Sequence, residues 1–104
     1  MSTFLSYVVH GVAVGCGGVA FYDGFAEVKR MFTRPTARRK GVAAALLQRL
    51  EGEARGAGHS VLRLETGMYQ DEAIGFYERA GFRRDGEPFE DGGLMSLRMR
   101  RPLA

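Results

Sequence analysis

The sequence predicts an α+β fold in which a mixed, mostly antiparallel sheet contains one central strand–helix–strand crossover. Two observations support this prediction. Residues 4–33 read as consecutive strands separated by tight turns, whereas from Gly41 onward the apolar residues recur at helical spacing. The chain has 104 residues, which is enough for one packed core but not for two, so we expect a single domain over residues 1–104.

The first third of the chain is predicted to be a three-stranded meander. Phe4–Val9 and Val12–Tyr22 are rich in Val, Phe and Tyr, and a short turn separates them. The dipeptide Asp23-Gly24 is a strong hairpin signal and leads into a third strand, Phe25–Thr33. The meander is expected to end at Arg34-Pro35, because proline has no N–H to donate to a ladder.

A crossover is predicted to follow the meander. Apolar residues recur at three- and four-residue steps between Val42 and Ala54, which indicates a helix with one apolar face that ends near 56–58. Ser60–Thr66 alternates apolar and polar residues, as strands do. The order of strand, helix and strand predicts a right-handed parallel crossover.

The last part of the chain is predicted to hold a second helix and two more strands. The helix covers about 71–80, and Gly81 is placed to terminate it in a left-handed conformation. Phe82–Arg84 and Leu94–Arg100 are the predicted strands, and the polar segment 85–93 is expected to be a turn between them.

The net charge of +3 and the sequence pI of about 9.4 favour an anionic ligand. The basic residues are scattered except in segment 34–40, which no aromatic residue interrupts, so a phosphate-bearing small molecule is favoured over nucleic acid. No apolar run approaches the roughly 20 residues of a membrane span. Cys16 is the single cysteine, which fits a reducing compartment, and we therefore expect a cytoplasmic protein.

Two weaker features do not indicate sites of their own. The run Gly15-Cys16-Gly17-Gly18 is similar to a fragment of a dinucleotide-binding loop, but it lies inside strand-like sequence and no helix follows it. A bulge or a close backbone approach is the favoured interpretation. His10 and His59 are expected in surface turns far apart in the sequence, so with one cysteine they predict no metal site.

The most specific feature is the segment Arg38-Arg39-Lys40-Gly41-Val42-Ala43, which follows a strand and opens a helix. The first turn of a helix has N–H groups without partners and carries the positive end of the helix dipole, so it accepts phosphate. Small residues at Gly41 and Ala43 allow a pyrophosphate to approach the backbone. On these grounds alone, an exposed basic turn before an ordinary helix remains an equal interpretation.

Two segments together resemble the GNAT family of N-acetyltransferases. Ala26–Thr33 followed by Arg38–Ala43 is similar to the central motif of that family, Arg/Gln-x-x-Gly-x-Gly/Ala. Glu72–Phe82 is similar to the family's later helix, in which a tyrosine is followed by three residues and Gly-Phe. The resemblance spans roughly residues 12–100 with matching order and spacing, which makes the two motifs more specific together than either is alone.

The resemblance implies acetyl-CoA as the cofactor and a role for each matching residue. The implied pantetheine-binding residues are Met31, Phe32 and Thr33, and the implied pyrophosphate-binding residues are Arg38, Arg39, Lys40, Gly41, Val42 and Ala43. Tyr77 stands where the family commonly has the general acid that reprotonates the CoA thiolate, and Glu27 stands where some members have the general base. Tyr77 is also explained as a core residue, and Glu27 as a solvated charge.

The resemblance also implies a GNAT-like sheet that lacks the family's usual N-terminal strand and helices, because this chain starts at the second strand. The function implied is transfer of acetyl from acetyl-CoA to a primary amine, on a small molecule or a peptide, by direct attack. The alternative is a non-catalytic acyl-CoA-binding module that has lost its acceptor site and completes its fold as a homodimer. A small nucleic-acid-binding domain is a third hypothesis.

Overall fold

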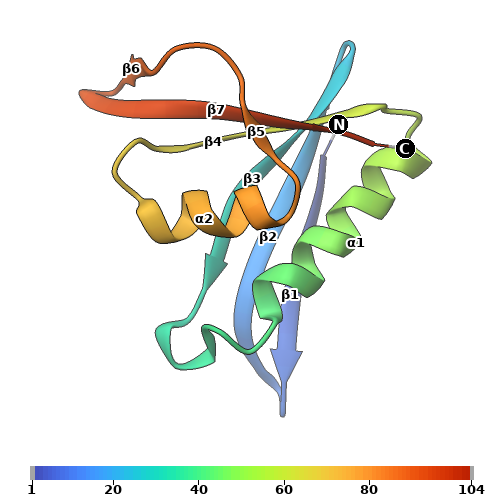
Figure 1. Cartoon of the computed structure of the whole chain (residues 1–104). Coiled ribbons are helices and arrows are strands. Elements are labelled where there is room, and N and C mark those ends of the chain that lie inside the picture. The colour runs from blue at the N-terminus through green and yellow to red at the C-terminus, as the bar shows by residue number, and fades with distance from the viewer. Residues whose placement is uncertain (1, 104) are drawn as a thin grey trace.

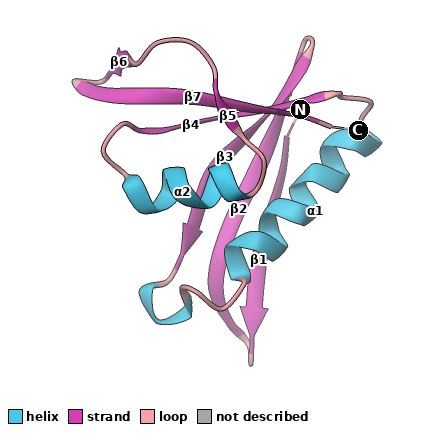
Figure 2. Cartoon of the chain, in the orientation of Figure 1, coloured by secondary structure: helices cyan, strands magenta, loops and turns pink. Residues whose placement is uncertain are grey.

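A computed structural model describes residues 2–103. Over this range the chain forms three strands, a helix, a strand, a second helix and three further strands, so the predicted order holds apart from the short additional elements η1 and β6 (Figures 1 and 2). The elements are β1 (Ser2–Val9), β2 (Val12–Tyr22), β3 (Phe25–Thr33), the 3-10 helix η1 (Pro35–Ala37), α1 (Val42–Gly56), β4 (Val61–Gly67), α2 (Asp71–Arg79), β5 (Arg83–Arg84), β6 (Phe89–Asp91) and β7 (Leu94–Pro102).

The strands form one mixed sheet in the order β1-β2-β3-β4-β7-β5, and β6 pairs with β7. β3 and β4 run parallel, and α1 connects them, while the other pairs are antiparallel. The predicted α+β class and the mostly antiparallel sheet with a central crossover are therefore confirmed. A parallel pair needs such a crossover because its two strands enter from the same end of the sheet.

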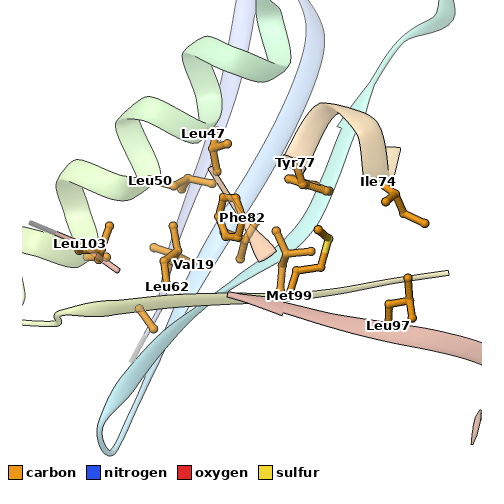
Figure 3. Packing of buried hydrophobic residues seen from close by; sticks show 14 residues of the cluster. Val19, Leu47, Leu50, Leu62, Ile74, Tyr77, Phe82, Leu97, Met99 and Leu103 are labelled. Carbon is orange, nitrogen blue, oxygen red and sulfur yellow. The ribbon is translucent and has the colours of Figure 1, made fainter. Parts of the chain in front are cut away.

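The core lies between one face of the sheet and the two described α-helices (Figure 3). Leu50 of α1 and Tyr77 of α2 belong to the same buried cluster as Leu62 of β4 and Met99 of β7. Fully burying a side chain of the size of leucine contributes about 1.5–3 kcal/mol. Because both helices pack against this cluster, the sheet fixes the position of the N-terminus of α1 relative to α2.

The glycines of β2 leave room for α1, which packs on the sheet, and for the neighbouring strand β3. A Cβ atom at Gly15 would lie 2.7 Å from Cγ1 of Val42 and 3.1 Å from the carbonyl oxygen of Phe32. The register between β2 and β3 shifts between Cys16 and Gly18, and the additional residue lies in β3, between Lys29 and Phe32. Of the two predicted alternatives, a bulge or a close backbone approach, the close approach is confirmed in this glycine-rich run.

Three sequence-based expectations need correction. β1 begins at Ser2 rather than at Phe4, because Ser2 and Thr3 pair with Ala20 and Val19. The segment 85–93 is not only a turn, since Phe89–Asp91 forms strand β6 against β7. His59 is half-buried rather than on the surface, because its ring stacks on Phe21 with centroids 5.5 Å apart.

The C-terminus of α2 depends on Gly81, which adopts a φ of 97°. The N–H of Gly81 donates to the carbonyl of Glu78 at 3.0 Å, and that of Phe82 donates to the carbonyl of Tyr77 at 2.9 Å. These two bonds form a Schellman motif, in which a left-handed residue lets the chain satisfy the last helical carbonyls. The predicted terminator is confirmed.

We expect substitutions at two glycines to change stability in opposite directions. Gly81→Ala should lower the free energy of unfolding by about 1–2 kcal/mol, because a Cβ atom is unfavourable in the left-handed conformation. Gly52→Ala should raise it by about 0.5–1 kcal/mol, because Gly52 is helical and a Cβ there meets no atom within 4 Å. Urea denaturation of both variants measures this, and changes of the same sign would contradict the prediction.

Neither of the described α-helices is long and apolar enough to cross a membrane. The longer of the two, α1, has 15 residues and carries charged residues on its exposed face. The expected cytoplasmic location stays a prediction.

Candidate active site

The site lies where β3 and β4 separate. Within the described chain their parallel pairing is confined to Ala26 with Leu62 and Glu27 with Arg63. On its other side β3 stays paired with β2 as far as Thr33. The main-chain groups of β3 beyond Glu27 consequently have no strand partner on the side of β4, and such groups are available to hydrogen-bond an extended ligand.

A cavity of about 600 Å³ opens beside the end of β3. We call it the first cavity. Its walls come from β3, from the loop and first turn of α1, and from α2. The predicted site residues that line it are Met31, Phe32, Thr33, Arg38, Arg39, Gly41, Val42, Ala43 and Tyr77. The fold thus brings together residues that are up to 46 positions apart, counted from Met31 to Tyr77.

The N-terminus of α1 faces this cavity without an internal cap. The first helical main-chain bond is donated by Ala45 to the carbonyl of Gly41 at 3.0 Å, so the preceding N–H groups have no helical partner. The N-cap Gly41 has a φ of 81°, makes no side-chain capping bond, and is followed by no acidic residue in the first turn. A helix N-terminus without a cap can bind an anion, because its free N–H groups and the helix dipole both favour negative charge.

The two arginines of the loop lie at the mouth of the first cavity. The guanidinium Nε of Arg38 donates to the carbonyl of Thr33 at 3.2 Å and ties the loop to the end of β3. The Nε atom of Arg39 lies 4.0 Å from the carboxylate of Glu72 on α2. Both members of that ion pair are exposed, and such pairs contribute only about 0–1 kcal/mol, so an anionic ligand can replace the carboxylate. Lys40 is exposed and is not among the lining residues.

Tyr77 projects from α2 into the boundary between the core and the first cavity. Its side chain is only 9% exposed, and its ring packs edge-on against Phe76 and Phe82 at centroid distances of 5.2 and 5.7 Å. Burial raises the pKa of Tyr77 above its ordinary value of 10.0. The phenol is therefore protonated at neutral pH and can donate its proton. Tyr77 is therefore both a core residue and a lining residue of the first cavity.

Glu27 lies on the opposite face of the sheet, which the alternation of strand side chains explains. Ala26 and Val28 point into the core under the helices, so Glu27 and Lys29 point to the other face. Glu27 is 7% exposed and forms an ion pair with Lys29. The hydrogen bond to Glu27, only partly opposed by desolvation, raises the pKa of Lys29 above 10.5.

Glu27 lines a second, mostly polar cavity of about 240 Å³. This second cavity is bounded by the diverging parts of β3 and β4, and by β6 and β7. Its lining residues are Glu27, Val28, Lys29, Arg30, Glu65, Thr66, Gly67, Asp91 and Ser96. The second cavity has lining residues from both β3 and β4, whereas the first has lining residues from β3 and none from β4. The structure does not place Glu27 and Tyr77 in one cavity.

Sequence reasoning missed most of the wall that α2 contributes to the first cavity. The lining residues that were not predicted are Ala37, Ala44, Gln70, Asp71, Glu72, Ala73, Phe76 and Arg79. The position of Tyr77 could have identified part of this wall, because residues three and four positions away on a helix lie on the same face. Which face of α2 borders the cavity was decided by packing against the sheet.

Comparison with known proteins agrees with this architecture. The model of the acetyltransferase (GNAT) family matches residues 2–82. IAA acetyltransferase from Azospirillum brasilense is 48% identical over 97 residues, which are 89% of this chain and 63% of that protein. The chain belongs to the GNAT acetyltransferase family, and it spans less than two thirds of the length of that relative.

Solved structures of longer proteins superpose on almost the whole chain. Nourseothricin acetyltransferase is 27% identical with a TM-score of 0.90 and matches over 99% of this chain and 66% of its own. PaiA N-acetyltransferase from Thermoplasma acidophilum, in complex with coenzyme A, has a TM-score of 0.85 at 21% identity, over 97% of this chain and 60% of its own. The predicted family and fold are confirmed, and acetyl-CoA is the cofactor of that family. The roles of individual residues stay predictions.

Proposed function

We propose that this chain transfers an acetyl group from acetyl-CoA to a primary amine, by direct attack of the amine. The observation that supports it is the first cavity, where an uncapped helix N-terminus, the loop arginines and a buried tyrosine lie beside the unpaired edge of β3. An anion site alone fits many ligands. An anion site joined to a strand edge and a proton donor fits a long phosphorylated thioester.

In this proposal each part of the first cavity has one task. The N–H groups at the start of α1, with Arg38 and Arg39, bind the pyrophosphate, and the main chain of Met31–Thr33 holds the pantetheine arm. Bound acetyl-CoA would supply an acetyl group activated as a thioester. Tyr77 keeps its proton at neutral pH and donates it to the leaving sulfur.

The acceptor amine enters through the second cavity. Glu27 is a buried carboxylate on that side, and it accepts the proton that an ammonium group must lose before it can attack. Lys29 stays charged beside it and balances the buried negative charge. A volume of about 240 Å³ with mostly polar walls suits a small polar amine or the end of a peptide side chain.

Thermal denaturation with different ligands tests the cofactor assignment. We expect acetyl-CoA and CoA to stabilise the protein by about 2.7 kcal/mol at a concentration of 100 times Kd, and ATP at the same concentration to have no such effect. Loss of the stabilisation as salt is raised would indicate that a charged surface binds the phosphates without specificity. No stabilisation by either CoA species would contradict the proposal.

A panel of amines then separates an enzyme from a binding module. Release of free CoA thiol that depends on one amine class supports catalysis and identifies the acceptor. Binding of CoA without turnover of any amino acid, polyamine, aminoglycoside or peptide would favour the alternative, a non-catalytic acyl-CoA-binding module.

A further inference from the structure

We propose that residues 13–15 of β2, and Gly15 in particular, hold the two halves of the cofactor site at a fixed distance from each other. The two halves are the edge of β3, which binds the pantetheine arm in the proposed function, and the start of α1, which binds the pyrophosphate. This inference rests on that proposed function and adds positioning residues to it. Residues 13–15 are not among those that line the first cavity, so they act through other residues and not on the cofactor itself.

Gly15 is adjacent to both halves of the site, where β2 passes under the start of α1 (Figure 1). It pairs with Thr33 at the end of β3, and a Cβ atom on it would lie 3.1 Å from the carbonyl oxygen of Phe32. The same Cβ would lie 2.7 Å from Cγ1 of Val42, the first residue of α1, and 3.3 Å from Cδ1 of Leu46. Contacts of Cβ atoms are almost never shorter than 3.0 Å, and the side chain of Val42 is stiff and buried. Any larger residue at position 15 must therefore displace the start of α1.

The neighbours of Gly15 in β2 hold the loop that connects the two halves. Arg34, the first residue after β3, donates its main-chain N–H to the carbonyl of Val14 at 2.8 Å and its Nε to the carbonyl of Ala13 at 2.7 Å. Arg34 belongs to the basic segment 34–40, but it does not line the first cavity. Its part in the site is therefore to anchor the loop to β2.

A small apolar cluster completes this support. Ala37 of η1 is buried with Val42 and Leu46 of α1, and Val14 and Met31 pack against them. Val14 is the additional residue at the register shift of β2 against β1, and such a bulge re-aims a side chain. Close-packed side chains respond to a change of volume as small as one methylene group. A change on β2 at this point is consequently transmitted to the loop and to the start of α1.

The distance between the two halves matters because CoA is one molecule that occupies both of them. The affinity of a ligand with two linked parts depends on how well the spacing of the two subsites matches the ligand. A fragment that occupies one half does not depend on that spacing. A defect in positioning therefore weakens the binding of CoA and leaves the binding of the fragment unchanged.

Isothermal titration of the full chain with CoA and with its nucleotide half, 3′-phospho-ADP, tests the proposal. We expect Gly15→Ala to weaken CoA binding by about 10- to 100-fold, because the two subsites are moved out of register. Its affinity for 3′-phospho-ADP should equal that of the wild type. A partly unfolded variant would instead lose affinity for both ligands by the same factor, since only the native state binds them.

Three further variants make the test specific. Val42→Ala added to Gly15→Ala removes the atom nearest to the new Cβ, so the double variant should bind CoA more tightly than Gly15→Ala does. Arg34→Lys keeps the charge but removes the planar guanidinium that anchors the loop, so it should also weaken CoA more than 3′-phospho-ADP. Gly52→Ala is the matched control, because it adds the same methyl group to α1 where no atom lies within 4 Å, and its affinity for CoA should equal that of the wild type.

The outcomes separate this inference from the proposed function. Wild-type affinity of Gly15→Ala for CoA would overturn the positioning role, and so would equal losses for CoA and 3′-phospho-ADP. A double variant that binds CoA no better than Gly15→Ala would overturn it as well, because displacement of α1 would then not be the cause. If circular dichroism shows that Gly15→Ala does not fold, the comparison of the two ligands on Arg34→Lys decides. A wild-type protein that binds neither ligand would contradict the proposed function itself, and the positioning role with it.

Discussion

Tyr77→Phe is expected to lower kcat by about 100- to 10,000-fold while leaving the affinity for CoA unchanged, because it removes only the phenolic proton donor. The ring of Tyr77 supplies its packing against Phe76 and Phe82, and phenylalanine keeps that ring. Steady-state kinetics with the best amine of the panel, together with CoA titration, measures both quantities. Turnover equal to that of the wild type would remove Tyr77 from the chemistry and leave it as a core residue.

Two further variants make this test specific. Tyr69→Phe removes a hydroxyl from a side chain that is 80% exposed and does not line either cavity, so its turnover should match that of the wild type. Glu27→Gln should also slow turnover, but its deficit should shrink as pH rises toward the pKa of the acceptor amine, because a neutral amine needs no base. A deficit in Glu27→Gln that is the same at every pH would contradict the assignment of Glu27 as the base.

Ala43→Glu is expected to weaken CoA binding by about 100- to 1,000-fold. The new carboxylate would stand in the first turn of α1, where the pyrophosphate binds, and like charges about 4 Å apart near a protein surface repel by about 4 kcal/mol. The apo protein should not be destabilised, because a negative charge at a helix N-terminus contributes about 0.3–1 kcal/mol to stability. Isothermal titration with CoA and thermal denaturation of the apo protein measure the two effects.

Gln48→Glu is the matched control for Ala43→Glu. It changes the charge by the same amount on the same helix, at an exposed position that does not line the first cavity. We expect its affinity for CoA to be close to that of the wild type. If both variants lose binding equally, net charge explains the effect, and the N-terminus of α1 is not the pyrophosphate site.

Local patterns in the sequence were sufficient to predict most of the elements. Strand alternation, the Asp23-Gly24 turn and the helical spacing after Gly41 each depend on neighbours only a few residues away. They can therefore be recognised in the sequence without knowledge of the tertiary structure. β6 was missed for a related reason. Three residues are too few to show a period, and Phe89–Asp91 becomes a strand only because β7 supplies its hydrogen-bond partners.

The predicted pyrophosphate-binding segment could be recognised in the sequence too, because the start of the helix and its small and basic residues are consecutive. The sequence by itself therefore determined the order of elements, the family resemblance and the segment Arg38–Ala43. Only the tertiary structure decided that Lys40 stays outside the first cavity and that α2 supplies one of its walls. It also decided that Glu27 lines the second cavity and Tyr77 the first, on opposite faces of the sheet. Strand alternation puts a side chain on one of two faces, but the packing of α1 and α2 determines which face becomes the core.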